Sequence, residues 1–179
     1  ALEASGLLSH AIGGPSVFPP QPDGVMKLGQ MKREWNASTG SDRYRRGLYT
    51  FFWRATPYPA LTVFDAPNAT QVCTRRNRSN TPLQALTLLN EQAFVEIAQA
   101  LAGRILKTAP PNDAERIVYA FRLCLARPPQ PHEAQTLTRL LEQERADSTQ
   151  AENPSNADEL AWATAARVIL NLDEFITRE

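Results

Sequence analysis

Glycine is distributed very unevenly along this chain. Seven of its eight glycines lie in residues 1–80, and only Gly103 follows them. The same 80 residues carry seven of the fourteen prolines, with turn signals at Gly13-Gly14-Pro15 and throughout residues 18–24. Neither a long helix nor a sheet strand tolerates that composition. We therefore expect residues 1–40 to form an extended, largely irregular Pro/Gly-rich segment. It would pack on the rest of the chain or on domains outside this sequence.

Signals for helix starts recur in the second half. Thr81-Pro82-Leu83-Gln84 combines a capping threonine, a proline at the first helical position and a glutamine three residues after the cap. Asn112-Asp113-Ala114-Glu115 has a similar pattern, and apolar residues then recur every three to four positions. Short capped loops between such helices predict a mainly α fold, a helical bundle within a domain spanning residues 41–179. The five expected helices begin near Thr81, Asn90, Asn112, Pro131 and Ala157, with Asn90 as the cap of the second.

Residues 41–54 are rich in aromatic and basic side chains. The positions of Tyr44, Leu48, Phe51 and Phe52 follow helical spacing, so a further helix is expected here, capped by Ser41 or Asp42. The stretch opens a longer region that we call the arginine segment, residues 43–78. It holds seven arginines, one acid and half of the aromatic residues of a chain whose formal net charge is zero.

The arginine segment permits three interpretations. It binds an anion, or it pairs with the acidic residues 132–165, or it docks on another domain of the same polypeptide. Internal pairing or docking is favoured, because arginines clustered in a neutral domain are usually held by carbonyls and carboxylates. Asp65 is expected to anchor arginines rather than to act as a base. The candidates for anion binding or for an interface are Arg45, Arg46, Asp65, Arg75, Arg76, Arg78 and Asn80.

The chain shows no catalytic motif. It has two histidines and two cysteines, too few for a four-ligand zinc site without carboxylates, and no metal site is expected. There is no Cys-x-x-Cys-His for a c-type haem, so no cofactor is expected in this chain. Cys73 lies beside two arginines, but packing is a commoner role for a lone cysteine than reactivity. A Cys73–Cys124 bridge stays open, and catalytic residues stay unassigned.

Several stretches resemble one family over nearly the whole chain. They resemble the C-terminal domain of planctomycete cytochrome c-associated proteins, the domain of unknown function 1553. A mild departure is Ala126, where that family often has glycine. The stretches that carry the resemblance are residues 13–22, 44–51, Phe64-Asp65-Ala66-Pro67, residues 72–76, Asn80-Thr81-Pro82-Leu83-Gln84-Ala85-Leu86, residues 88–90, 121–123, 126–129 and 170–175.

The resemblance implies an exported, multidomain parent protein with haem c in another domain. It thus implies an extracytoplasmic location, periplasmic or secreted. It also implies that the partners of this chain are N-terminal domains of the same polypeptide. It brings no catalytic residue, because the family has no settled activity. The favoured function is a helical C-terminal portion whose arginines line an interface or cleft, in an oxidoreductase or a protein acting on anionic glycans. Whether it is an enzyme stays open.

Two alternatives remain. One is a module that binds polyanions without catalysis, and the other is a purely structural helical cap. Nucleic acid is not expected as a partner, because the net charge is zero. No apolar run reaches the roughly 18 residues of a membrane span.

Overall fold

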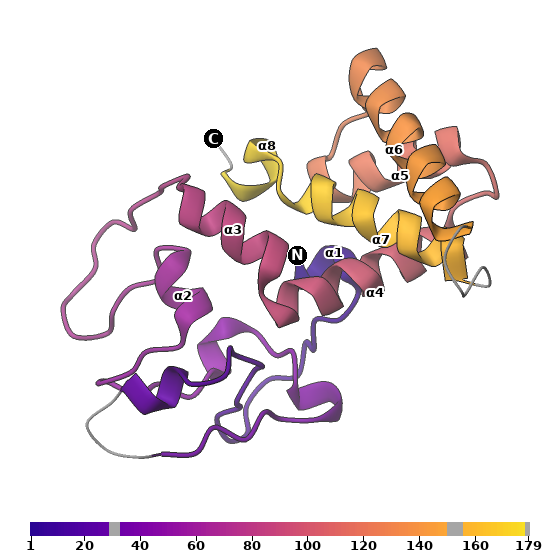
Figure 1. Cartoon of the computed structure of the whole chain (residues 1–179). Coiled ribbons are helices and arrows are strands. Elements are labelled where there is room, and N and C mark those ends of the chain that lie inside the picture. The colour runs from indigo at the N-terminus through magenta and orange to yellow at the C-terminus, as the bar shows by residue number, and fades with distance from the viewer. Residues whose placement is uncertain (29–32, 150–155, 178–179) are drawn as a thin grey trace. The chain divides into compact units, whose positions relative to one another are not determined.

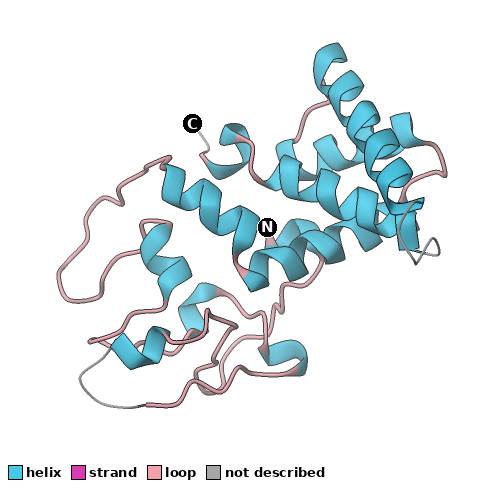
Figure 2. Ribbon diagram, viewed as in Figure 1, coloured by secondary structure: helices cyan, strands magenta, loops and turns pink. Residues whose placement is uncertain are grey.

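The computed structural model describes residues 1–28, 33–149 and 156–177 (Figure 1). The protein is mainly helical, and Figure 2 shows no strand in the part described. The predicted fold class is therefore confirmed. The helices are α1 (Leu2–Ser5), α2 (Pro59–Val63), α3 (Pro82–Asn90), α4 (Gln92–Thr108), α5 (Asp113–Leu125), α6 (Pro131–Thr149), α7 (Ala157–Leu170) and α8 (Asp173–Ile176).

Two of the predicted helix starts have side-chain caps, with the full capping box at Thr81 and only the cap half at Asn112, whose own N–H donates to the Pro110 carbonyl at 2.8 Å. The Thr81 hydroxyl accepts from the Gln84 N–H at 3.3 Å, and the Gln84 side chain accepts from the Thr81 N–H at 3.0 Å. The Asn112 side chain accepts from the N–H groups of Ala114 and Glu115 at the start of α5. Local sequence sets these starts, because each cap satisfies backbone donors that have no partner within the helix.

The predicted cap at Asn90 is wrong. Asn90 is the last residue of α3, and its side chain donates back to the Leu86 carbonyl. Glu91 takes the capping role instead, because its carboxylate accepts from the Ala93 N–H at 3.1 Å. A carboxylate at a helix start also suits the positive end of the helix dipole.

The chain divides into two compact units. The helical unit comprises Ala1–Leu7 and Val95–Glu179, and the loop-rich unit comprises Leu8–Phe94. Of the predicted extended segment 1–40, residues 1–7 thus belong to the first unit and residues 8–40 to the second. Whether that segment also packs on further domains stays a prediction.

The helical unit buries one face of each of its longer helices. Trp162 of α7 is fully buried, together with Phe121 of α5 and Leu141 of α6. The N-terminal residues join this unit: Arg104 of α4 donates to the carbonyls of Glu3 and Ala4, each at 2.9 Å. The guanidinium thus bonds two carbonyls near the end of α1, and at Glu3 it joins the Gly6 N–H, which donates to the same carbonyl at 3.1 Å.

The loop-rich unit is built from extended chain, short turns and stacked aromatic rings. The predicted helix over residues 41–54 is wrong: two short 3₁₀ turns, Gly40–Asp42 and Gly47–Tyr49, lie there instead. The backbone pairs with the earlier segment instead, since the Val17 N–H donates to the Tyr49 carbonyl and the Phe51 N–H to the Val17 carbonyl, both at 2.8 Å. Long-range pairing therefore outweighed the helical spacing of the apolar residues.

Aromatic rings fill the interior of this unit. The Phe18 ring stacks on Phe51 with 5.0 Å between centroids and meets Trp35 edge-on at 5.1 Å. Trp35 stacks in turn on Tyr58, whose hydroxyl donates to the Pro20 carbonyl at 2.7 Å. Around Pro19 and Pro20 the segment is thus held by stacked rings and by a hydrogen bond to a carbonyl, in addition to the backbone pairing of Val17.

Candidate functional site

Arg45 is a buried arginine at the start of the arginine segment. Its side chain is held in the loop-rich unit and only 6% of the residue is exposed. One guanidinium nitrogen donates to the carbonyls of Ala11 and Gly13 at 2.8 and 2.7 Å, and the group lies 3.9 Å from the centre of the Tyr49 ring. These contacts fix the loop around Gly13, so Arg45 has a structural role.

Tyr49 completes this contact from the other side. Its hydroxyl accepts a hydrogen bond from the Gly13 N–H at 3.0 Å. That bond lowers the pKa of Tyr49, the charges of Arg46 and Arg45 act in the same direction, and desolvation opposes them. Arg46 itself is exposed, with its guanidinium 5.8 Å from the same ring.

Asp65 closes the connection between α2 and α3. The Ser79 N–H and hydroxyl donate to one carboxylate oxygen of Asp65 at 2.9 and 2.6 Å. The buried Gln84 side chain donates to the Ser79 hydroxyl at 3.0 Å and to the Val63 carbonyl at 2.9 Å. We call these three side chains, Asp65, Ser79 and Gln84, the clasp. It joins the two ends of a long irregular loop.

The loop that the clasp closes surrounds a hollow of about 400 Å³. Arg75 and Arg76 both line it and both are exposed. Most of the other lining groups are amides, hydroxyls or small side chains, and Asp65 is the one acid among them. The full lining is Thr62, Asp65, Ala66, Pro67, Asn68, Gln71, Val72, Cys73, Thr74, Arg75, Arg76 and Asn77.

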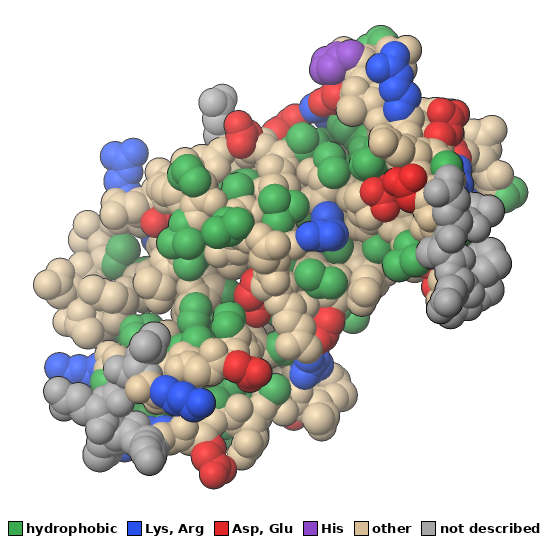
Figure 3. Space-filling view, viewed as in Figure 1, with side chains coloured by type: hydrophobic (Ala, Val, Ile, Leu, Met, Phe, Trp, Pro, Cys, Tyr) green, Lys and Arg blue, Asp and Glu red, His purple; other side chains and the backbone are tan. Residues whose placement is uncertain are grey.

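The hollow brings together only some of the predicted site residues. It joins Asp65, Arg75 and Arg76, whereas Arg45 and Arg46 lie at the Tyr49 contact. Arg78 and Asn80 are exposed beside the clasp and are not part of the lining. On the face drawn in Figure 3, basic side chains lie singly or in small groups rather than in one continuous patch. This face therefore offers an anion no wide basic surface.

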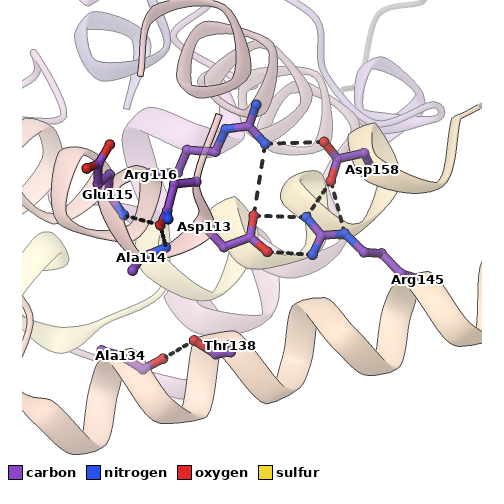
Figure 4. Close-up of polar contacts among 9 residues, drawn as sticks. Asp113, Ala114, Glu115, Arg116, Ala134, Thr138, Arg145 and Asp158 are labelled. Carbon is purple, nitrogen blue, oxygen red and sulfur yellow. Dashed lines mark hydrogen bonds and ion pairs between the residues drawn. The ribbon is translucent and has the colours of Figure 1, made fainter. Parts of the chain in front are cut away.

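Two of the acidic residues in 132–165, Glu133 and Asp158, bind arginines of their own unit. Asp158 of α7 contacts Arg116 of α5 and Arg145 of α6, and Asp113 bridges the same two arginines (Figure 4). In a second cluster, Arg127 holds the carboxylates of Glu133 at 2.8 Å and Glu174 at 2.6 Å. Glu133 and Asp158 are thus engaged by arginines outside the arginine segment.

The PSD1 family model, described as "Protein of unknown function (DUF1553)", matches residues 1–141. The chain belongs to this family. The match includes the buried Arg45, the clasp and the hollow. The chain matches no curated protein and no solved structure.

The two cysteines of this DUF1553 chain have different surroundings. Both are free in the structure, with Cys73 exposed in the lining of the hollow and Cys124 buried in α5. Burial raises the pKa of the Cys124 thiol to about 11, so it stays protonated near neutral pH. The Cys73 thiol donates to the Arg75 carbonyl at 3.4 Å and helps to shape the loop.

Two functional neighbours of the DUF1553 site had no clear signal in the sequence. No local pattern marks Ser79, although it makes both bonds to Asp65. The sequence predicts Gln84 only as a capping residue, yet it also links Ser79 to Val63. The Ser-Asn-Thr-Pro run indicates that polar side chains cap the start of the helix. Such a run does not predict which distant carboxylate those side chains bind.

The described part of the DUF1553 chain gives two further findings. Nowhere in it do three His, Cys, Asp or Glu side chains gather as a metal site would require. None of the helices it contains combines the length and apolarity needed to cross a bilayer.

Proposed function

We propose that this DUF1553 chain is the C-terminal helical portion of a larger, exported, cytochrome c-linked protein. In that protein the hollow at residues 62–77 forms one wall of a cleft that takes an anionic ligand. The resemblance described above supports the larger architecture, including N-terminal domains and haem c outside this chain. The observation that supports an anionic ligand is that two exposed guanidinium groups, those of Arg75 and Arg76, line the same hollow.

The chemistry of the lining favours an acidic glycan as the ligand. Guanidinium groups bind carboxylate or sulfate groups through two parallel hydrogen bonds. Asn68, Gln71 and Thr74 add amides and a hydroxyl that suit the hydroxyl groups of a sugar. A volume of about 400 Å³ also falls in the usual range of small-ligand pockets, about 300–1,000 Å³.

The clasp supports the same proposal. Asp65 is bonded by Ser79, and Gln84 holds Ser79 in place, so the ends of the loop are fixed before any ligand arrives. Fixing a binding loop in advance reduces the entropy lost on binding. Whether the parent protein then oxidises or hydrolyses its ligand depends on groups outside this chain.

Two other functions remain as alternatives. A polyanion-binding module without catalysis would use the same two arginines. The observation that favours a purely structural cap is Arg45, whose guanidinium donates to two backbone carbonyls and lies against the Tyr49 ring.

Calorimetry with an acidic oligosaccharide, an oligogalacturonate, tests the ligand. We expect binding that weakens as salt rises, and its loss in the double variant Arg75→Ala/Arg76→Ala. The matched control removes two charges elsewhere, with Arg122→Ala/Arg139→Ala on α5 and α6, where both arginines are exposed, and should bind normally. Absence of binding at low salt, or equal loss in both variants, contradicts the proposal.

A second experiment separates a cleft wall from a binding module. The same double variant in the full-length parent should lose turnover of the glycan if the hollow belongs to an active-site cleft. Unchanged turnover in a folded variant that no longer binds the oligosaccharide favours the module.

A further inference from the structure

The connection between α2 and α3 is the longest exposed stretch of irregular chain that the structure describes. Every residue from 67 to 78 is exposed, and none of them lies in a helix or a strand. Arg75 and Arg76 lie next to each other near its end. We propose that this loop is a cleavage site for a serine protease specific for basic residues, which cuts after Arg75 or Arg76, and that the cut protein remains one folded particle.

The position of the cut follows from what a protease needs. It binds several residues of its substrate in an extended form, so an exposed irregular loop is cut long before a helix. Arg75 and Arg76 present their basic side chains in such a loop, where no helix has to unfold before the chain can enter the protease. Arg122 and Arg139 are exposed too, but they belong to α5 and α6, whose backbone bonds would have to break first.

The clasp explains why we expect the cut after Arg75 or Arg76 and not after Arg78. The bond after Arg78 joins it to Ser79, whose N–H and hydroxyl are both held by Asp65. A protease would have to break these two bonds to draw the chain into its site. The bonds after Arg75 and Arg76 lie outside the clasp, where the Arg75 carbonyl accepts a weak hydrogen bond from the Cys73 thiol at 3.4 Å.

The reaction is hydrolysis of one peptide bond. The C–N bond after Arg76, for example, breaks, the hydroxide part of a water joins the carbonyl carbon, and a proton of that water goes to the nitrogen of Asn77. The products are a new carboxylate and a new ammonium group in the lining of the hollow. A cut therefore also changes the hollow, although the proposal does not depend on any ligand.

The two pieces should stay together because contacts on both sides of the cut join them. Gln84, which is 1% exposed, bonds the Val63 carbonyl across the cut, and Ser79 bonds Asp65. The Phe64 and Phe94 rings also meet with 5.6 Å between centroids. In the helical unit, Arg104 holds the carbonyls of Glu3 and Ala4, so the N-terminal piece is attached there as well.

Limited trypsin digestion of the native protein tests this, with the first cut mapped by mass spectrometry. We expect residues 1–75 or 1–76 as the first N-terminal product, and co-elution of both pieces in one peak on size-exclusion chromatography. A first cut at any other position would contradict the proposed cleavage site. Pieces that elute separately under native conditions would contradict the proposal that the cut protein remains one folded particle.

Three variants sharpen the result. Arg75→Gln/Arg76→Gln should lose the first cut, while Arg78→Gln and Arg54→Gln should keep it. The substituted arginines are exposed, so the fold should be retained, and an unchanged thermal unfolding curve checks this. Retention of the cut in the double variant, or its loss in either control, contradicts the proposal.

Discussion

Asp65 and Ser79 are separated by 14 positions in the sequence and share two hydrogen bonds, with both Ser79 donors on one carboxylate oxygen. The Asp65 backbone has a φ of 57°, in the left-handed region that few residues other than glycine, asparagine and aspartate adopt. An aspartate therefore serves two needs at this position: it turns the chain after α2, and it holds the far end of the loop.

Asp65→Ala should destabilise the loop-rich unit by about 2–3 kcal/mol, because it removes two bonds to a charged acceptor. Hydrogen exchange measured by mass spectrometry should rise around residues 64–84. Asp65→Asn is the matched control, since asparagine keeps an acceptor oxygen and tolerates the same backbone conformation. Equal exchange in the alanine variant and the native protein would refute a stabilising role for the clasp.

Arg45→Ala should cost about 3 kcal/mol in the free energy of unfolding, measured by urea denaturation. The change leaves the Ala11 and Gly13 carbonyls without their donor and removes the contact with the Tyr49 ring. The neighbouring exposed Arg46→Ala is the control and should change stability by no more than about 0.5 kcal/mol. Similar effects from the two substitutions would argue against a specific role for the buried arginine.

Ala126→Gly should stabilise the protein by about 0.5–1 kcal/mol and raise the midpoint of unfolding. Ala126 ends α5 with φ 59° and ψ 18°, a conformation in which a Cβ is strained and glycine is not. Ala163→Gly within α7 is the control, and it should destabilise by about 1 kcal/mol. A loss of stability in both variants would exclude relief of strain at position 126.

The helical unit should lose stability in acid through the cluster of Arg127, Glu133 and Glu174. Hydrogen bonds from Arg127 lower the pKa of Glu133 to about 2 and also lower the pKa of Glu174. Because the folded pKa lies below the unfolded one, this stabilisation is present above about pH 4.5 and is lost as the pH falls toward about 2. After screening by solvent, the Glu133 contribution should be about 1–2 kcal/mol.

Urea midpoints measured between pH 7 and pH 2 test this, with Arg127→Gln as the comparison. The variant should be less stable at pH 7, where Glu133 and Glu174 repel each other, and should lose less stability on acidification. Parallel pH curves for the variant and the native protein would show that Arg127 does not lower the pKa of either glutamate.

The predicted helices of the second half were found because their signals are local. A threonine cap, a proline after it and a glutamine three residues on satisfy donors within one turn, so Thr81 and Gln84 can be interpreted without knowing the fold. The failure at residues 41–54 has the opposite cause. Val17 supplies the backbone partners of Tyr49 and Phe51 from more than 30 positions away, and no local pattern announces such pairing.

The sequence by itself determined the mainly helical second half, the irregular first part and the concentration of arginines at residues 43–78. Caps, apolar spacing and charge are properties of neighbouring residues, and they act before the chain is compact. Only the tertiary structure decided that Arg45 is buried on two carbonyls, that Asp65 meets Ser79, and that Arg75 and Arg76 stay exposed. A backbone carbonyl is the same at every position, so the partner that an arginine finds depends on where the folded chain brings that carbonyl.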